Sequence, residues 1–304
     1  MQRTRNFLWR LILLTQRPDF RRNPVHAILK RLCWRIRWRL YSEPWLLRLP
    51  NGMRIIVPQS GSGALIYYQG WSEPEVASFL IRFLSPGMSF IDIGAHIGEY
   101  VLLAASIVGE RGSVHAFEPD PRNYQLLEQN VHMHRFQSVF LHNCAVYEQN
   151  GQVTLSLFRE QSISRIMVPE QKLNEPDKLH TSEVIVPAVT LDTFLTKEKI
   201  IRVDIIKIDV EGAELFVLKG AHGILSQEPK SAPVILFEYS PSNCANFGYN
   251  ATEIIELLIS YGYTLYSLHR SGKVSEVRTI DVPFGRHCNL VASKDESKLA
   301  CIKG

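Results

Sequence analysis

The chain of 304 residues is 45% hydrophobic and 21% charged, with a formal net charge of +4. This composition is ordinary for a soluble globular protein, and the length allows one α/β domain with an extension. The five cysteines are odd in number and widely spaced, with no CxxC pair. They argue against a disulfide framework and a structural zinc site, and they favour a reducing, cytoplasmic setting.

The small net charge conceals a strong asymmetry along the chain. Residues 1–40 hold eleven of the 34 Lys and Arg residues and only one acid, Asp19, which gives this segment a charge of +10. The remaining residues therefore carry a charge of −6. Because the larger part is mildly acidic, it gives no ground for expecting nucleic-acid binding by that part.

The basic arm, which we delimit as residues 1–44, contains two apolar stretches. The first, within 7–14, is interrupted by Arg10, is too short to span a membrane and lacks the cleavage site of a signal peptide. The second, within 25–36, has apolar residues at helical spacing with basic residues between them, and it predicts an amphipathic helix. Such a helix either attaches peripherally to an anionic membrane through residues 1–40 or packs across the catalytic domain.

Residues 45–87 form the predicted connection between the arm and the core. Two short apolar runs on either side of Pro50-Asn51-Gly52 predict a β-hairpin over 45–57. A helix is expected over 72–84, with Ser72 as its N-cap and Glu75 as the capping-box partner.

A strand, a glycine-spaced turn and a helix are predicted over 90–108. The apolar run from Phe90 reaches an aspartate and then a turn with Gly94 and Gly98, a spacing that lets a ligand approach the backbone and the start of the helix. The next strand, 113–118, ends at Glu118, about two dozen residues after Gly94, where an acid reaches ribose hydroxyls in nucleotide-binding folds. The glycines lack the spacing of a pyrophosphate fingerprint, so a nucleoside without a pyrophosphate fits better, and S-adenosylmethionine is the common one.

Strands and helices continue to alternate after Glu118, which implies a parallel, doubly wound sheet. A helix is expected over 121–135 and a long one over 213–226, and a polar loop over 159–182. The further predicted strands cover 138–143, 151–158, 183–190, 204–210, 234–239, 264–268 and 289–292, and the further predicted helices 191–195 and 252–260.

Four segments of the chain resemble the FkbM family of methyltransferases. They are residues 90–100, 115–121 (HAFEPDP), 189–194 (VTLDTF) and 206–221 (IKIDVEGAELFVLKGA), of which KIDVEG is the most specific. The resemblance implies a class I, S-adenosylmethionine-dependent methyltransferase domain over 88–295, with a Rossmann-like, mainly parallel sheet of seven strands. His96 stands where the family more often has Asn, at a position that serves as a turn or cap residue.

Polar residues end five successive strands of the predicted sheet, where open parallel sheets bind their ligands. Each of them alone is explained as well by the capping of a following helix, but five together argue for a site. We expect Asp92 to orient groups around the methionine part of the cofactor, and the resemblance assigns the ribose to Glu118. The predicted cofactor-binding residues are Asp92, Gly94, Ala95, Gly98, Glu118, Asn143 and Cys144, although Cys144 is better explained as a small apolar filler.

The segment after the fourth strand faces the transferred methyl group in this fold, and it holds the catalytic candidates Asp209 and Glu211. Either carboxylate can accept a proton from an acceptor hydroxyl or position the acceptor, and Glu211 is also explained as a favourable charge at a helix start. Glu238 is a weaker candidate. The Asn/Asp-Pro-Pro-Tyr/Phe turn of amino-group methyltransferases is absent, which favours an oxygen acceptor. Tyr239-Ser240 replaces the Asp-Asn pair of metal-dependent enzymes, so we expect no metal.

The sequence therefore predicts an O-methyltransferase that uses S-adenosylmethionine. Its acceptor class, a hydroxyl on a sugar, glycolipid or polyketide-like metabolite, comes from the resemblance, and residues 159–180 are expected on the acceptor side. Two alternatives stay open: methylation of a nucleic acid gripped by the basic arm, and a non-catalytic nucleotide-binding module at a membrane. The oligomeric state cannot be predicted from the sequence.

Overall fold

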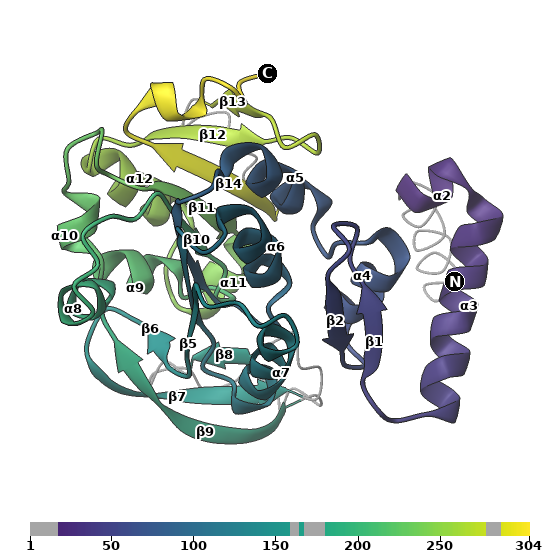
Figure 1. Ribbon diagram of the computed structural model, residues 1–304. Helices are drawn as coiled ribbons and strands as arrows, with labels where there is room; N and C mark the ends of the chain where they lie inside the picture. The colour runs from purple at the N-terminus through teal and green to yellow at the C-terminus, as the bar shows by residue number, and fades with distance from the viewer. Residues whose placement is uncertain (1–17, 159–163, 167–179, 278–286) are drawn as a thin grey trace, which may run out of the picture. The chain divides into compact units, whose positions relative to one another are not determined.

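The computed structural model describes residues 18–158, 164–166, 180–277 and 287–304. The apolar stretch predicted within 7–14 and most of the loop predicted on the acceptor side lie outside these residues. The chain forms two compact units, Met1–Pro74 and Glu75–Gly304, each with its own architecture (Figure 1). The predicted segment boundaries at residues 44 and 87 stay a prediction.

The first unit confirms the predicted amphipathic helix and hairpin. Asn23 caps helix α3, because its side chain accepts a hydrogen bond from the His26 N–H and Pro24 occupies the first turn. Helix α4 was not predicted, since its Gly-Ser-Gly start has low helix propensity; Ser60 caps it by accepting from the Gly63 N–H at 3.0 Å. The elements are α2 (Pro18–Arg22), α3 (Pro24–Leu40), β1 (Trp45–Arg48), β2 (Arg54–Val57) and α4 (Gly61–Gln69), with β1 and β2 antiparallel.

Aromatic rings hold the first unit together. The buried Trp34 of α3 stacks on Trp45 of β1 and on Tyr67 of α4, with ring centroids 6.1 and 5.7 Å apart. The Lys30 ammonium on the same face of α3 donates to the carbonyl oxygens of Tyr67 and Tyr68. One face of the arm helix is therefore packed inside its own unit.

The second unit is built on an eight-stranded sheet in the order β13-β12-β14-β11-β10-β3-β4-β5. The five strands from β11 to β5 are parallel, and β14 is antiparallel to both of its neighbours. This confirms the predicted mainly parallel α/β fold; the short edge strand β13 makes the sheet one strand wider than expected. The strands are β3 (Ser89–Ile93), β4 (Ser113–Phe117), β5 (Val139–His142), β10 (Ile205–Ile208), β11 (Val234–Tyr239), β12 (Thr264–Leu268), β13 (Val274–Glu276) and β14 (Cys288–Ser293).

Helices cover both faces of this sheet, with α5, α6 and α7 on one side and α8, α9, α10 and α12 on the other (Figure 1). The long helix predicted over 213–226 is wrong: it is divided into α9 and α10 near Gly220, whose missing Cβ would lie 2.2 Å from the Tyr147 carbonyl oxygen. The short helix α11 was not predicted. The helices are α5 (Pro74–Phe83), α6 (Glu99–Val108), α7 (Pro121–His132), α8 (Leu191–Lys197), α9 (Glu214–Lys219), α10 (His222–Leu225), α11 (Pro241–Asn246), α12 (Thr252–Ser260) and a final 3₁₀ turn, Glu296–Leu299.

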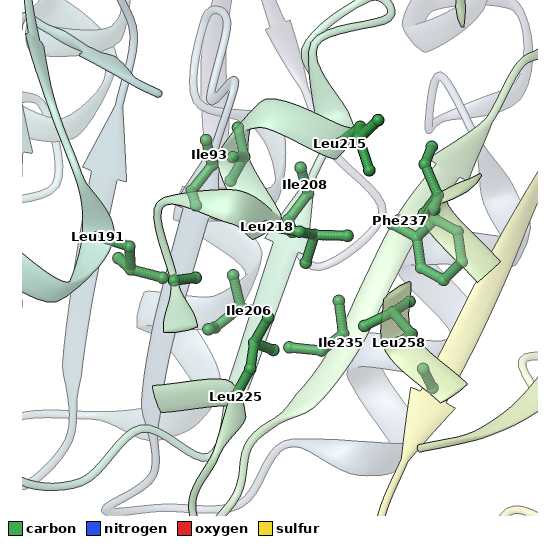
Figure 2. Packing of buried hydrophobic residues seen from close by; sticks show 14 of the residues in the cluster. Ile93, Leu191, Ile206, Ile208, Leu215, Leu218, Leu225, Ile235, Phe237 and Leu258 are labelled. Atoms are coloured by element: carbon green, nitrogen blue, oxygen red, sulfur yellow. The ribbon is translucent and has the colours of Figure 1, made fainter. Parts of the chain in front are cut away.

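Aliphatic side chains from the central strands and the helices on one face fill the core (Figure 2). Ile206 and Ile208 of β10 and Ile235 and Phe237 of β11 are all buried, and Leu218 of α9 packs against them. Central strands of a parallel sheet are buried on both faces, which explains their nearly continuous apolar sequence. Lys207 is the one charged residue of the otherwise apolar strand β10, and its burial there requires a partner for its charge.

A second, four-stranded sheet in the order β6-β9-β7-β8 lies beside the core. Its apolar face packs against Ala213 and Phe247, which belong to the segments that follow β10 and β11. The sheet therefore supports the edge of the main sheet at which the catalytic candidates were predicted. Its strands are β6 (Ala145–Val146), β7 (Gly151–Phe158), β8 (Ser164–Ile166) and β9 (His180–Val189), of which β7 and β9 were predicted and β6 and β8 were not.

Candidate active site

The carboxyl ends of the parallel strands bring the predicted site residues toward one edge of the sheet. In the register of the sheet, Asp92 of β3 lies opposite Lys207 of β10 on one side and Ala116 of β4 on the other. Register partners on parallel strands point to the same face, so a buried acid and a buried amine face each other.

Asp92 is fully buried, and neither of its carboxylate oxygens accepts a hydrogen bond from the described residues. The Lys207 ammonium lies 3.4 Å from Oδ1, which is close enough for an ion pair. Burial raises the pKa of Asp92 to about 6, and the charge of Lys207 opposes that rise. Buried carboxylate oxygens are costly without donors, so this site suits a ligand that brings N–H or O–H groups.

Glu118 follows β4 and fixes the turn that follows β3. Its Oε2 accepts a hydrogen bond from the His96 N–H at 2.8 Å, and its Oε1 accepts one from the Asp120 N–H at 2.9 Å. Burial raises the pKa of Glu118 to about 8, although these backbone donors favour the ionised form. The Asn123 side chain is a third hydrogen-bond partner of this carboxylate. A carboxylate has about four acceptor positions, so Glu118 keeps acceptor capacity for one ribose hydroxyl.

The glycine-spaced turn is required by packing in this structure. Gly94 has φ of 85°, and a Cβ there would lie 1.8 Å from the carbonyl oxygen of Asp209. The N–H groups of Gly94 and Ala95 both donate to the Phe117 carbonyl oxygen. Gly98 has φ of 89° and faces Leu127 of α7. The turns after β3 and β10 thus touch through backbone atoms; the predicted contacts of Gly94, Ala95 and Gly98 with the cofactor stay predictions.

Two further predicted cofactor residues lie after β5. The side-chain amide of Asn143 donates to the Glu118 carbonyl oxygen at 2.8 Å and so ties the end of β5 to the loop after β4. Burial raises the pKa of Cys144 to about 11, which keeps it a thiol at neutral pH. These contacts explain Asn143 and Cys144 structurally, and their contact with an adenine edge stays a prediction. His96 has φ of 50°, a left-handed conformation that Asn adopts readily.

Lys207 is a site residue that the sequence analysis missed. Its ammonium is buried, lies 3.1 Å from Oδ2 of Asp209 and 3.4 Å from Oδ1 of Asp92, and faces the Tyr100 ring at 5.2 Å. One cation thus links a cofactor candidate to a catalytic candidate. A lysine inside an otherwise apolar central strand was the signal that would have found it, because lysine is rarely buried without a partner.

A second polar cluster joins the other two catalytic candidates. The Asn243 amide of α11 donates to Oε2 of Glu211 at 2.9 Å and to Oε2 of Glu238 at 3.4 Å. His287 lies on the exposed side of this cluster, with Nδ1 3.3 Å from Oε1 of Glu238. Glu211 has φ of 55°, an uncommon backbone conformation for a residue other than glycine. We call Glu211, Glu238, Asn243 and His287 the acceptor cluster. Asn243 and His287 were missed because only the tertiary structure brings them to Glu238.

Glu214 stabilises the loop that carries Asp209 and Glu211. Its Oε1 accepts hydrogen bonds from the N–H groups of Val210 and Gly212 at 3.1 and 3.2 Å. Burial raises the pKa of this carboxyl to about 7. The sequence analysis also missed this role, for which an acid in the first turn of a helix was the signal.

Comparison with known proteins agrees with this geometry. The model of the family described as "Methyltransferase FkbM domain" matches residues 92–265 of this chain. The chain belongs to the FkbM methyltransferase family. This confirms the predicted family, and with it the methyltransferase domain and S-adenosylmethionine as its cofactor.

Two curated relatives carry methyltransferase names. "31-O-demethyl-FK506 methyltransferase FkbM" of Streptomyces tacrolimicus is 23% identical over 242 residues, which cover 72% of this chain and 88% of the relative. "Methyltransferase 1" of Beauveria bassiana is 30% identical over 148 residues, 44% of this chain, and the match spans 59% of the relative's own length. Among solved structures, Aeropyrum pernix fibrillarin with bound S-adenosyl-L-methionine is 14% identical, with 82% of this chain and 93% of fibrillarin covered and a TM-score of 0.40.

The described residues fit this cofactor. The oxygens of Asp92, which accept no hydrogen bond from the described residues, suit the N–H donors of its amino-acid part. The remaining acceptor position of Glu118 suits a ribose hydroxyl. Within the described ranges, no cluster of three or more His, Cys, Asp or Glu residues could hold a metal ion. No helix in the described part of the chain is long and apolar enough to cross a bilayer.

Proposed function

We propose that this protein is an S-adenosylmethionine-dependent O-methyltransferase whose acceptor is a hydroxyl on a sugar, a glycolipid or a polyketide-like metabolite. The acceptor cluster beside Asp209 is the observation that carries the proposal. It gathers carboxylates and a histidine, which are groups that take a proton from a hydroxyl. The name of the Streptomyces tacrolimicus relative supports an oxygen acceptor, because it describes methylation of 31-O-demethyl-FK506.

The cofactor would supply the methyl group of a sulfonium, whose C–S bond would break in line as the acceptor oxygen forms the new C–O bond. Glu118 and Asp92 hold this cofactor at the ends of β4 and β3, with the backbone of Gly94 beside them. Lys207 stabilises the ionised form of Asp92 and also holds the Asp209 carboxylate in place, since its ammonium lies within 3.4 Å of both carboxylates. The Asp209 carboxylate is held by this buried cation, and in the proposal it positions the acceptor.

His287 accepts the proton of the acceptor hydroxyl in this proposal. Its Nδ1 faces the Glu238 carboxylate, which favours the tautomer with hydrogen on Nδ1 and leaves Nε2 free to accept a proton. Asn243 holds Glu238 and Glu211 in place, and Glu211 contacts the acceptor. A neutral imidazole is suited to this step because one ring nitrogen can accept a proton while the other donates to a carboxylate.

The experiment that tests the proposal uses isotope-labelled S-adenosylmethionine and a small-molecule extract, followed by identification of the labelled product. We expect the label on an oxygen atom. With that acceptor, His287→Gln should lower kcat by about 10²-fold or more. Glu211→Gln should mainly raise KM, and Asp209→Asn should lower kcat less than His287→Gln does.

His132→Gln is the matched control, because His132 is exposed on α7 and outside the site. Calorimetry with the unlabelled cofactor should give the same affinity for His287→Gln as for the parent chain. Label transfer to nitrogen or carbon would overturn the oxygen acceptor. If kcat is unchanged in His287→Gln, the proton acceptor is Glu211 or Asp209 and not His287.

The proposed location of this enzyme is the reducing cytoplasm. All five cysteines are free, and Cys244 is buried within the core, where a thiol behaves as a small apolar side chain. A prediction follows directly: reducing agents should leave activity unchanged, and mass spectrometry of protein purified without them should detect five free thiols.

A further inference from the structure

Helix α3 has two apolar faces, and only one of them is used within its own unit. Ala27 and Trp34 are buried on one face, beside the Lys30 side chain that reaches the carbonyl oxygens of α4. The opposite face carries six apolar side chains whose exposed fractions lie between 47% and 67%. They are Val25, Ile28, Leu29, Leu32, Ile36 and Leu40, and we call them the apolar stripe.

The spacing of the apolar stripe is that of one continuous helix face. Counted from Val25, its members recur three, four, seven, eleven and fifteen residues later, so they follow the helix along its whole length. Soluble proteins rarely expose a contiguous apolar surface of this kind without a partner. The packing of the first unit does not explain these residues, because the opposite face makes the contacts with α4 and β1.

Arginines border the apolar stripe. Arg35 lies one helical turn after Leu32, and Arg39 lies one turn after Ile36, so a basic edge runs along the stripe. Both arginines are exposed and form no ion pair within the described residues, and the same is true of Arg21 and Arg22 just before α3. The one acid of this segment, Asp19, is already paired with Arg31 at 2.6 Å.

We propose that the apolar stripe of α3 lies in the surface of an anionic membrane, with Arg35 and Arg39 at the level of the lipid phosphates. This surface has the chemistry of a membrane-binding helix. Its apolar face can insert at the boundary between headgroups and acyl chains, and the flanking arginines can extend their charged ends to the lipid phosphates. An uncharged protein partner would leave the basic edge without a counterpart. The first unit thus attaches the enzyme to the bilayer.

The test measures co-sedimentation of the full chain with two kinds of vesicle, phosphatidylcholine alone and phosphatidylcholine mixed with phosphatidylglycerol. The parent chain should bind the anionic vesicles and leave most protein in solution with the neutral ones, and high salt should weaken binding. Leu29→Gln with Leu32→Gln should lower the partition coefficient by about 100-fold. Arg35→Gln with Arg39→Gln should lower it by about 10-fold or more.

Matched controls use residues of the second unit. Ile201→Gln changes an apolar side chain that is 93% exposed, and Arg111→Gln with Lys230→Gln removes two exposed basic charges. Both controls should bind anionic vesicles like the parent chain. Cofactor affinity, measured by calorimetry, should be the same in every variant.

Three results would overturn the proposal. Equal binding of the stripe variant and the parent chain would assign any vesicle binding to other parts of the chain. A larger fall in melting temperature for Leu29→Gln with Leu32→Gln than for Ile201→Gln would mean that the stripe packs inside the protein. Sedimentation of the parent chain as a dimer that the stripe variant cannot form would assign the stripe to contact between two copies.

Discussion

The two compact units of this protein differ in charge and in what holds them together. The unit Met1–Pro74 contains 13 of the 34 basic residues and three of the 30 acids, a charge of +10, and rings stacked around Trp34 stabilise it. The unit Glu75–Gly304 carries −6 and is stabilised by aliphatic side chains around a mainly parallel sheet. The family match lies entirely in the acidic unit, whereas the basic unit carries the apolar stripe that we propose binds a membrane.

The largest expected effect is in the second unit, at the contact between the turns after β3 and β10. Gly94→Ala should destabilise this unit by about 3 kcal/mol or more and abolish cofactor binding, because the new Cβ would collide with the Asp209 carbonyl oxygen. Gly87→Ala is the control: Gly87 has nearly the same φ, 88° against 85°, but nothing within 4 Å of its missing Cβ.

Urea unfolding monitored by circular dichroism measures the difference between the two variants. Gly87→Ala should cost only the strain of a left-handed alanine, about 1–2 kcal/mol. Equal losses of unfolding free energy in both variants would mean that the structure around Gly94 adjusts to the new Cβ and that the two turns are not rigidly packed.

Trp34→Ala should destabilise the first unit by about 3–5 kcal/mol, since it removes a buried ring with four aromatic neighbours. Leu32→Ala on the exposed face of the same helix should change stability by less than about 0.5 kcal/mol. Tryptophan fluorescence and limited proteolysis report on this unit, and cofactor binding reports on the other. Loss of cofactor binding in Trp34→Ala would show that the two units are energetically coupled.

Glu118→Ala should raise the dissociation constant for S-adenosylmethionine by about 100-fold or more, because charge-assisted hydrogen bonds contribute about 1.5–3 kcal/mol each. The variant should still fold, since Glu118 lies at the end of β4 and outside the aliphatic core. Glu118→Gln, which keeps one acceptor oxygen, should give an intermediate value. Unchanged affinity in a folded Glu118→Ala protein would remove Glu118 from the cofactor site.

The smallest expected effect is a change of melting temperature with pH. It concerns the second unit, because the carboxyl groups with raised pKa values lie there. Burial raises the pKa to about 6 for Asp92, about 7 for Glu214 and about 8 for Glu118. A carboxyl whose folded pKa exceeds its unfolded value favours the folded state at low pH, and this contribution is lost as pH rises through the folded value. The cofactor-free protein should therefore melt about 2–4 °C lower at pH 8.5 than at pH 6.5.

The buried His115 and the half-buried His142 have the opposite effect on stability, and they do so over a lower pH range. Burial lowers the pKa of His115 and His142 to about 4, so their contribution is present above about pH 6.5 and lost below it. Melting between pH 6.5 and 8.5 therefore isolates the carboxyls, and Glu118→Gln should reduce the difference. A melting temperature that rises over this interval would contradict the raised pKa values.

The sequence by itself determined the second unit's fold and the ends of its strands. The run from Phe90 to Gly98 is a local pattern whose apolar residues and turn glycines specify strand, turn and helix without reference to distant parts of the chain. The acid after β4 and the KIDVEG segment likewise mark the ends of strands. The amphipathic helix of the arm was equally local. Predictions of this kind held because neighbouring residues alone decide them.

Only the tertiary structure decided which polar groups meet. The parallel register places Lys207 between Asp92 and Asp209, and the unpredicted helix α11 brings Asn243 to Glu211 and Glu238. The tertiary structure also decided which face of α3 is buried, because amphipathic spacing does not show which side chains pack on α4. The physical reason is that these contacts join residues far apart in the chain, and their energies depend on burial and register, which a local pattern does not contain.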